Sequence, residues 1–218
     1  MKSDGCEYYK YVLLYTDDAL VISENGEKVL RTEIGKSYFE LKEESIGPPD
    51  IYLGSKMRKV VLSNGAEVWS FSSLHYVKSA VSNVEDYLAK KGLKLPARAN
   101  TPLSPNYSPE VDTSLEFNAT DAAYYQSLIG VLRWMVELGR VGICCEVSMM
   151  SSHLALPRTG RLEQLYHTFA YLKKYHNSEM VFDPSESEID MSQFERKDWD
   201  SSEFGGDLHE EFPPKALA

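Results

Sequence analysis

The sequence has few cysteines, and their spacing matches no common metal site. Cys6, Cys144 and Cys145 are odd in number and form no C-x-x-C pair, which argues against a disulfide framework and against a zinc site. No apolar run approaches the roughly 18 residues of a membrane-spanning helix, and the N-terminus lacks the apolar core of a signal peptide. We therefore expect a cytoplasmic or nuclear protein with reduced thiols and no membrane partner.

Basic charge is also scarce, because the 218 residues carry a net charge of −10. The imbalance is concentrated in residues 183–211, which contain eleven acidic and two basic residues. Residues 1–182 contain 22 acidic and 20 basic residues and are nearly neutral. A nearly neutral body can still present a local basic face to phosphate groups, so the charge neither predicts nor excludes a nucleic-acid partner.

Strand and helix patterns alternate in the first part of the chain. Apolar runs with turn residues between them predict two β-hairpins, and apolar residues at helical spacing predict two helices. The predicted strands are 7–14 with 19–23, joined at Tyr15 to Asp18, and 50–62 with 68–72, joined at Asn64-Gly65. The predicted helices are 26–38 and 73–91.

Proline and polar residues interrupt these patterns over 92–120, which favours a linker or an irregular loop. Three helices and a short strand are predicted after it, over 121–138, 142–153, 160–176 and 180–182. The chain is therefore predicted to be α+β and to have four parts. These are 1–95, a linker over 96–120, a helical region over 121–182 and an acidic, flexible tail over 183–218.

The first hairpin places two adjacent carboxylates, Asp17 and Asp18, between apolar strands. Aspartate is common in turns because its side chain bonds the local backbone, so a structural role is one interpretation. Metal binding is the other, since carboxylates on a rigid turn can hold the Mg²⁺ ions of phosphoryl transfer. The residue types alone favour the structural interpretation.

Tyr15-Thr16-Asp17-Asp18 resembles the Tyr-x-Asp-Asp box of reverse transcriptases. Further blocks follow in the order found in copia-type retrotransposon polyproteins, and together they favour the catalytic interpretation. These blocks are Tyr38-Phe39-Glu40-Leu41-Lys42, Tyr52-Leu53-Gly54, Thr101-Pro102-Leu103, Tyr125 to Leu132, Val147 to Met150 and Tyr171-Leu172-Lys173.

The resemblance implies an RNA-directed DNA polymerase with antiparallel palm-type hairpins, followed by a mainly helical thumb and connection region. Asp17 and Asp18 would be its catalytic residues and its ligands for Mg²⁺ or Mn²⁺, on opposite faces by strand alternation. Tyr15 would lie near the primer terminus. The implied partners are a primer–template, deoxynucleotides and the remainder of the polyprotein, within a virus-like particle in the intact element.

Tyr52, Leu53 and Gly54 occupy the place of the family's primer grip, with an ordinary strand and a glycine bulge as the alternative. A set of cations follows, which either faces the phosphates of a duplex or forms a solvated surface. The set comprises Lys56, Arg58 and Lys59 after the primer grip and Lys78, Lys90, Lys91, Lys94 and Arg98 around the next helix.

Polymerases of this family also use a third aspartate well upstream of the box, and fingers that bind nucleotide and template. The 14 residues before Tyr15 contain one aspartate, Asp4, which is too close to the box for that role. We therefore expect this chain alone to lack primer extension. The alternative is a non-catalytic module, derived from a retrotransposon, that binds nucleic acid or a protein.

Overall fold

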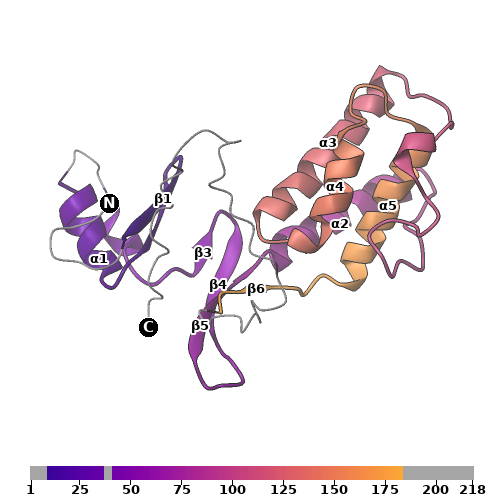
Figure 1. Ribbon diagram of the computed structural model, residues 1–218. Helices are drawn as coiled ribbons and strands as arrows, with labels where there is room; N and C mark the ends of the chain where they lie inside the picture. The colour runs from indigo at the N-terminus through magenta and orange to yellow at the C-terminus, as the bar shows by residue number, and fades with distance from the viewer. Residues whose placement is uncertain (1–8, 37–40, 184–218) are drawn as a thin grey trace, which may run out of the picture. The chain divides into compact units, whose positions relative to one another are not determined.

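The computed structural model describes residues 9–36 and 41–183, and the chain divides into two compact units (Figure 1). The first unit comprises Met1–Pro48 and Asp183–Ala218, and the second comprises Pro49–Phe182. The two predicted hairpins therefore belong to different units, whereas the sequence prediction grouped them within residues 1–95. Both units combine helical segments with antiparallel strands, so the α+β class is confirmed. The predicted tail after residue 183 lies outside the described residues.

The first unit is built on a two-stranded antiparallel sheet. β1 (Tyr11–Tyr15) pairs with β2 (Asp18–Ile22) in a register that places Tyr15 opposite Asp18. The predicted hairpin is confirmed, with a two-residue turn as its connection. β1 begins later than the predicted residue 7, and residues 7 and 8 lie outside the described part.

A short helical segment follows β2. α1 (Gly26–Lys28) begins after Asn25, whose side chain accepts a hydrogen bond from the Lys28 backbone N–H at 2.9 Å, and it continues as the π-helix η1 (Val29–Ile34). Val29 is buried. The helix predicted over 26–38 is confirmed as far as Ile34, and its last two positions lie outside the described residues. A 3₁₀ turn, η2 (Glu43–Ser45), completes the regular structure described in this unit.

The second unit begins with a four-stranded antiparallel sheet in the order β3-β4-β5-β6. Its strands are β3 (Ile51–Tyr52), β4 (Ser55–Val61), β5 (Glu67–Ser72) and β6 (Met180–Val181). The predicted Asn64-Gly65 turn joins β4 to β5, and Gly65 has the positive φ of 85° that favours glycine. The single strand predicted over 50–62 is wrong, because the chain reverses at Leu53 and Gly54.

A helical bundle forms the core of the second unit. Its helices are α2 (Leu74–Lys90), α3 (Ala119–Glu137), α4 (Cys144–Ser151), which follows the 3₁₀ turn η4 (Val141–Ile143), and α5 (Thr159–Lys174). These helices confirm the four predictions from the second unit's sequence within a few residues. Tyr125, Leu132 and Phe169 are completely buried between them. None of the helices in the described ranges is long and apolar enough to cross a membrane.

The segment 96–120, predicted as a linker, packs against this bundle. Ala99 and Pro109 are buried, and Leu103, Tyr107 and Phe117 contact the helical core. A 3₁₀ turn, η3 (Pro109–Val111), gives the segment some regular structure. It is therefore part of the folded second unit.

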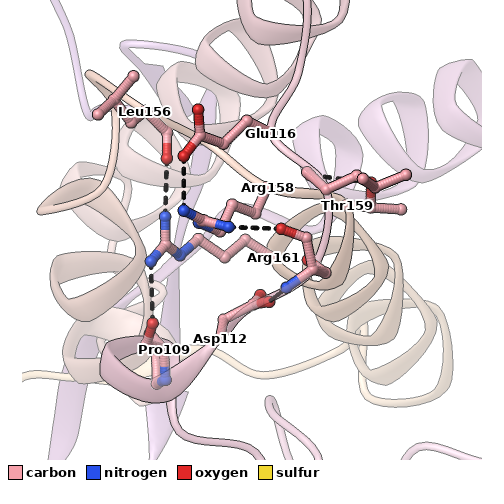
Figure 2. Close-up of polar contacts among 9 residues, drawn as sticks. Pro109, Asp112, Glu116, Leu156, Arg158, Thr159 and Arg161 are labelled. Carbon is pink, nitrogen blue, oxygen red and sulfur yellow. Dashed lines mark hydrogen bonds and ion pairs between the residues drawn. The ribbon is translucent and has the colours of Figure 1, made fainter.

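Two arginines at the start of α5 hold this segment in place (Figure 2). Arg161 is only 7% exposed and donates to the Pro109 carbonyl at 3.0 Å. Arg158 donates to the Ser114 carbonyl and to the Glu116 carboxylate, each at 2.6 Å. These hydrogen bonds join positions that are 42 to 52 residues apart in the sequence.

Asp112 forms hydrogen bonds within the same segment and lies against the first turn of α5. Its carboxylate accepts hydrogen bonds from the Tyr107 hydroxyl at 2.6 Å and from the Ser114 backbone N–H at 2.9 Å. Burial alone would raise the pKa of Asp112, but hydrogen bonds from Ser114 and Tyr107 outweigh burial and lower the pKa. A Cβ atom at Gly160 would lie 2.6 Å from this carboxylate, so the close approach requires glycine there.

Candidate metal-binding hairpin and basic groove

The tip of the first hairpin carries both predicted metal ligands. Thr16 and Asp17 form its two-residue turn, and Asp18 is the first residue of β2. Both aspartates are exposed to solvent. Asp17 lies in the turn and not in a strand, so strand alternation does not determine how the two carboxylates lie relative to each other.

The turn itself is strained at Thr16, which has a φ of 53°. Positive φ is a genuine outlier for a β-branched residue. Positive φ at the first turn residue alone is typical of a type II′ turn, which usually has glycine at that position. Such strain is worth about 1–3 kcal/mol. The stability of the turn therefore does not explain why threonine occupies position 16.

The donor set at the tip fits part of a magnesium site. Mg²⁺ is usually held by one or two carboxylates together with substrate phosphates and water, and Asp17 and Asp18 supply such a pair. Within residues 9–36 and 41–183, no group of three or more His, Cys, Asp or Glu side chains is placed to hold a metal. A complete two-metal site would therefore need a further ligand from outside the described residues.

Below the tip, β1 exposes apolar side chains on both of its faces. Leu13 and Leu14, which point to opposite faces by strand alternation, are 42% and 66% exposed. An isolated two-stranded hairpin is only marginally stable in water, and an exposed apolar patch commonly marks an interaction surface. The hairpin therefore has the composition of a sheet interior.

The residues predicted as a primer grip form a second tight turn. Tyr52 of β3 pairs with Ser55 of β4, and Leu53 and Gly54 between them have φ values of 53° and 87°. Positive φ at both central residues is typical of a type I′ turn. The alternative of a glycine bulge within a strand is therefore wrong.

The three cations on β4 do not form a uniform basic surface. Arg58 forms an ion pair with Glu179, which raises the pKa of Arg58. Lys59 lies 2.5 Å from Glu67, and strand alternation directs it away from the face that Lys56 and Arg58 share. Lys56 is exposed and forms no ion pair with any residue that the structure describes.

A groove of about 720 Å³ lies between the C-terminal parts of α2 and α5. Small apolar residues such as Ala89 and Ala170 line it, together with one carboxylate, Glu85, and three lysines: Lys94, Lys173 and Lys174. Lys173 lies 2.6 Å from Glu85, and Lys174 donates to the Asn100 side chain at 2.7 Å. The groove is a candidate contact surface for phosphate groups.

Sequence reasoning identified this groove only in part. Lys94 of the predicted cation set lines the groove. Lys90 and Lys91 of that set lie at the end of α2 and are not among the lining residues. Lys173 and Lys174 were missed. Their signal is the adjacent lysine pair in the last turn of the predicted helix 160–176.

Comparison with known proteins adds no family: no protein-family model, no curated protein and no solved structure matches this chain. The resemblance to copia-type reverse transcriptases rests on the sequence blocks.

Proposed function

We propose that this chain is part of a copia-type RNA-directed DNA polymerase, with Asp17 and Asp18 as its metal-binding catalytic residues. The observation that carries the proposal is the hairpin tip, where two adjacent carboxylates stand at a tight, strained turn between apolar strands. A second tight hairpin and a helical bundle follow in the chain. This is the order of palm, primer grip and thumb in that family.

In this proposal Asp17 and Asp18 hold Mg²⁺ or Mn²⁺ through their carboxylate oxygens. A bound metal ion stabilises charge on the reacting phosphoryl oxygens. The paired strands orient the two carboxylates, and their exposure leaves them accessible to a nucleotide. Tyr15 pairs with Asp18 in the ladder and would contact the primer terminus beside the same tip.

The second hairpin and the groove would position the nucleic acid. Tyr52, Leu53 and Gly54 would hold the primer end, since correct placement of reactants accounts for much of catalysis. Lys56 and the lysines of the groove would contact phosphates without reading sequence. The remainder of the polyprotein would cover the apolar strands of the first hairpin, in the cytoplasm or nucleus and within a virus-like particle.

A Mn²⁺ titration of the full chain, followed by NMR, tests the metal assignment. Mn²⁺ broadens the signals of nearby nuclei, so the backbone amides of residues 16–19 should broaden before those of the second hairpin. Asp17→Asn and Asp18→Asn should each remove this preference. Asp86→Asn, which changes an exposed carboxylate on α2, should leave it intact. Unchanged broadening in Asp17→Asn would refute the assignment.

The basic groove supports a second candidate function, a nucleic-acid-binding module without catalysis. Its lysines lie on the helical bundle and do not depend on the aspartate pair. Fluorescence anisotropy with a labelled RNA–DNA primer–template separates the two functions. The binding module would be supported if Lys94→Glu weakened binding, Asp17→Asn left binding unchanged and Mn²⁺ had no effect at the hairpin tip.

A further inference from the structure

The sequence contains two Asn-Gly pairs, and the structure places them in different surroundings. Asn25-Gly26 begins α1, whereas Asn64-Gly65 lies in the loop between β4 and β5. In an Asn-Gly pair the side-chain amide is open to attack by the next backbone nitrogen, because glycine has no side chain to obstruct the approach. The two pairs are therefore candidates for the same reaction and can be compared within one chain.

The second pair lies at an open loop tip. Ser63, Asn64 and Gly65 are all exposed, and a Cβ atom built on Gly65 would meet nothing within 4 Å. The loop is closed by hydrogen bonds from the Leu62 N–H to the Ala66 carbonyl at 2.9 Å and from the Gly65 N–H to the Leu62 carbonyl at 3.0 Å. The second bond holds the attacking nitrogen and must open before the reaction. Loop tips open at a low cost in free energy, so this bond slows the reaction without preventing it.

The side chain of Asn64 is held in a position that favours reaction. Its Oδ1 atom accepts a hydrogen bond from the Ala66 N–H at 2.9 Å, which keeps the side-chain amide beside the intervening peptide of Gly65. Holding the two reacting groups next to each other removes much of the entropic cost of the reaction. A donor on Oδ1 also stabilises the negative charge that develops there when a nucleophile adds to the carbonyl carbon.

Asn25 is held in a way that opposes reaction. Its Oδ1 atom accepts a hydrogen bond from the Lys28 N–H at 2.9 Å as the N-cap of α1, and its backbone carbonyl accepts from the Val29 N–H at 3.3 Å. Gly26 is half-buried, and a Cβ atom there would lie 3.5 Å from the Val21 carbonyl oxygen. Cyclisation would break the cap, and loss of a cap alone is worth a factor of about 5.

We propose that Asn64 is a site of spontaneous deamidation in the folded chain and that Asn25 is protected from it. The Gly65 backbone nitrogen attacks Cγ of Asn64 and forms a new C–N bond. The bond from Cγ to Nδ2 breaks, and the amide group leaves as ammonia with the proton of the attacking nitrogen. Water then opens the cyclic imide at either carbonyl and yields aspartate or isoaspartate. The net reaction consumes water and releases ammonia, so it needs no oxidant, metal or enzyme.

Conversion changes the charge and the backbone of the loop. Either product adds a negative charge at position 64, and isoaspartate also adds a carbon atom to the main chain. The hydrogen bonds between Leu62 and Ala66 and between Gly65 and Leu62 cannot keep their present geometry in the isoaspartate form. The inference uses neither the hairpin carboxylates nor the basic groove, so it would stand if the chain bound no metal and no nucleic acid.

Peptide mapping by mass spectrometry tests the proposal on the full chain, incubated at physiological temperature in a mildly alkaline buffer made with heavy-oxygen water. Alkaline pH favours the attack because the backbone nitrogen must lose its proton, and the heavy oxygen marks conversion that occurs during the incubation. In the folded chain Asn64 should convert at least about 5-fold faster than Asn25. In concentrated urea the loop and the cap are both lost, and the two rates should become similar.

Two matched variants make the result specific. Asn64→Gln keeps an exposed amide but lengthens the side chain, which disfavours cyclisation, and should remove most of the ammonia that the folded chain releases. Asn25→Gln should leave that release nearly unchanged. The proposal would be overturned if Asn64 stayed intact, if the two pairs reacted equally fast in the folded chain, if urea left the ratio of rates unchanged, or if Asn64→Gln released as much ammonia as the wild type.

Discussion

The helical bundle buries its apolar side chains, whereas the first hairpin leaves many of them exposed. Leu132 of α3 is completely buried among residues of the other helices, whereas Leu14 of β1 is 66% exposed. The bundle thus has a core of its own. The hairpin has apolar side chains on both faces, and no core covers both of these faces. The difference indicates that the bundle is stabilised by its own core, whereas the hairpin leaves apolar side chains open to solvent.

Truncation of one leucine in each region should reveal the largest difference in the free energy of unfolding. Leu132→Ala should lower the free energy of unfolding by about 2–5 kcal/mol, because it leaves a cavity in a packed core. Leu14→Ala should change it by about 0.5 kcal/mol or less, as surface substitutions do. Urea unfolding monitored by circular dichroism measures both. Equal losses would contradict the distinction between the two regions.

A pair of helical glycines tests whether residues 96–120 belong to the bundle. Gly160→Ala should lower the free energy of unfolding by about 1–3 kcal/mol, because its Cβ would displace the Asp112 carboxylate. Gly130→Ala on α3 meets nothing within 4 Å and should raise stability by about 0.5–1 kcal/mol. Thermal unfolding of both variants is the measurement. A neutral Gly160→Ala would mean that the contact contributes nothing.

The charge on Asp112 allows a pH-dependent test of its hydrogen bonds within residues 96–120. Asp112→Asn should lower the free energy of unfolding by about 1 kcal/mol near neutral pH, through weaker hydrogen bonds to Tyr107 and Ser114. The folded state lowers the pKa of Asp112 below its ordinary value of 3.8, so the unfolded chain takes up the proton first. The stabilisation is therefore present above that value and is lost as the pH falls through the lowered pKa.

Urea unfolding at a series of pH values measures this difference between wild type and Asp112→Asn. The gap should be full at neutral pH and should close in strong acid. A gap of constant size across the series would show that the charge of Asp112 does not contribute to these hydrogen bonds.

The smallest effect is expected at the outer end of the second hairpin. Lys59 and Glu67 are each more than half exposed, and exposed ion pairs contribute about 0.2–1 kcal/mol. Lys59→Gln should therefore lower the free energy of unfolding by at most about 0.5 kcal/mol, and added salt should remove the difference. Urea unfolding at low and high salt checks it. A loss above about 1 kcal/mol would show that this end of the sheet is not a solvated surface.

Helix periodicity was the most reliable signal in the sequence. The helix predicted over 73–91 is α2 (Leu74–Lys90), because Val77, Val81, Val84 and Leu88 face the core at helical spacing. The Asn64-Gly65 turn was equally clear, since that dipeptide suits a tight turn. Both features depend on local chemistry, which a short window of sequence contains.

Features that depend on distant partners could not be predicted in this way. Residues 96–120 are rich in proline and polar residues. Their packing depends on hydrogen bonds from Arg158 and Arg161, and these bonds span 42 to 52 residues of the sequence. The turn at Leu53 could not be predicted from the residue type, because leucine rarely adopts positive φ. At the candidate site, the aspartate pair was found from the sequence, but its position at a two-residue turn came only from the strand register.

Primer extension tests the catalytic role of Asp17 and Asp18 most directly, with this chain produced in one reading frame with the polypeptide encoded upstream of it. We expect Mg²⁺-dependent extension of a primer on an RNA template. Asp17→Asn should lose that activity and Asp86→Asn should retain it. Extension that survives Asp17→Asn, or an upstream sequence without a polymerase region, would contradict the assignment of Asp17 and Asp18 as catalytic residues.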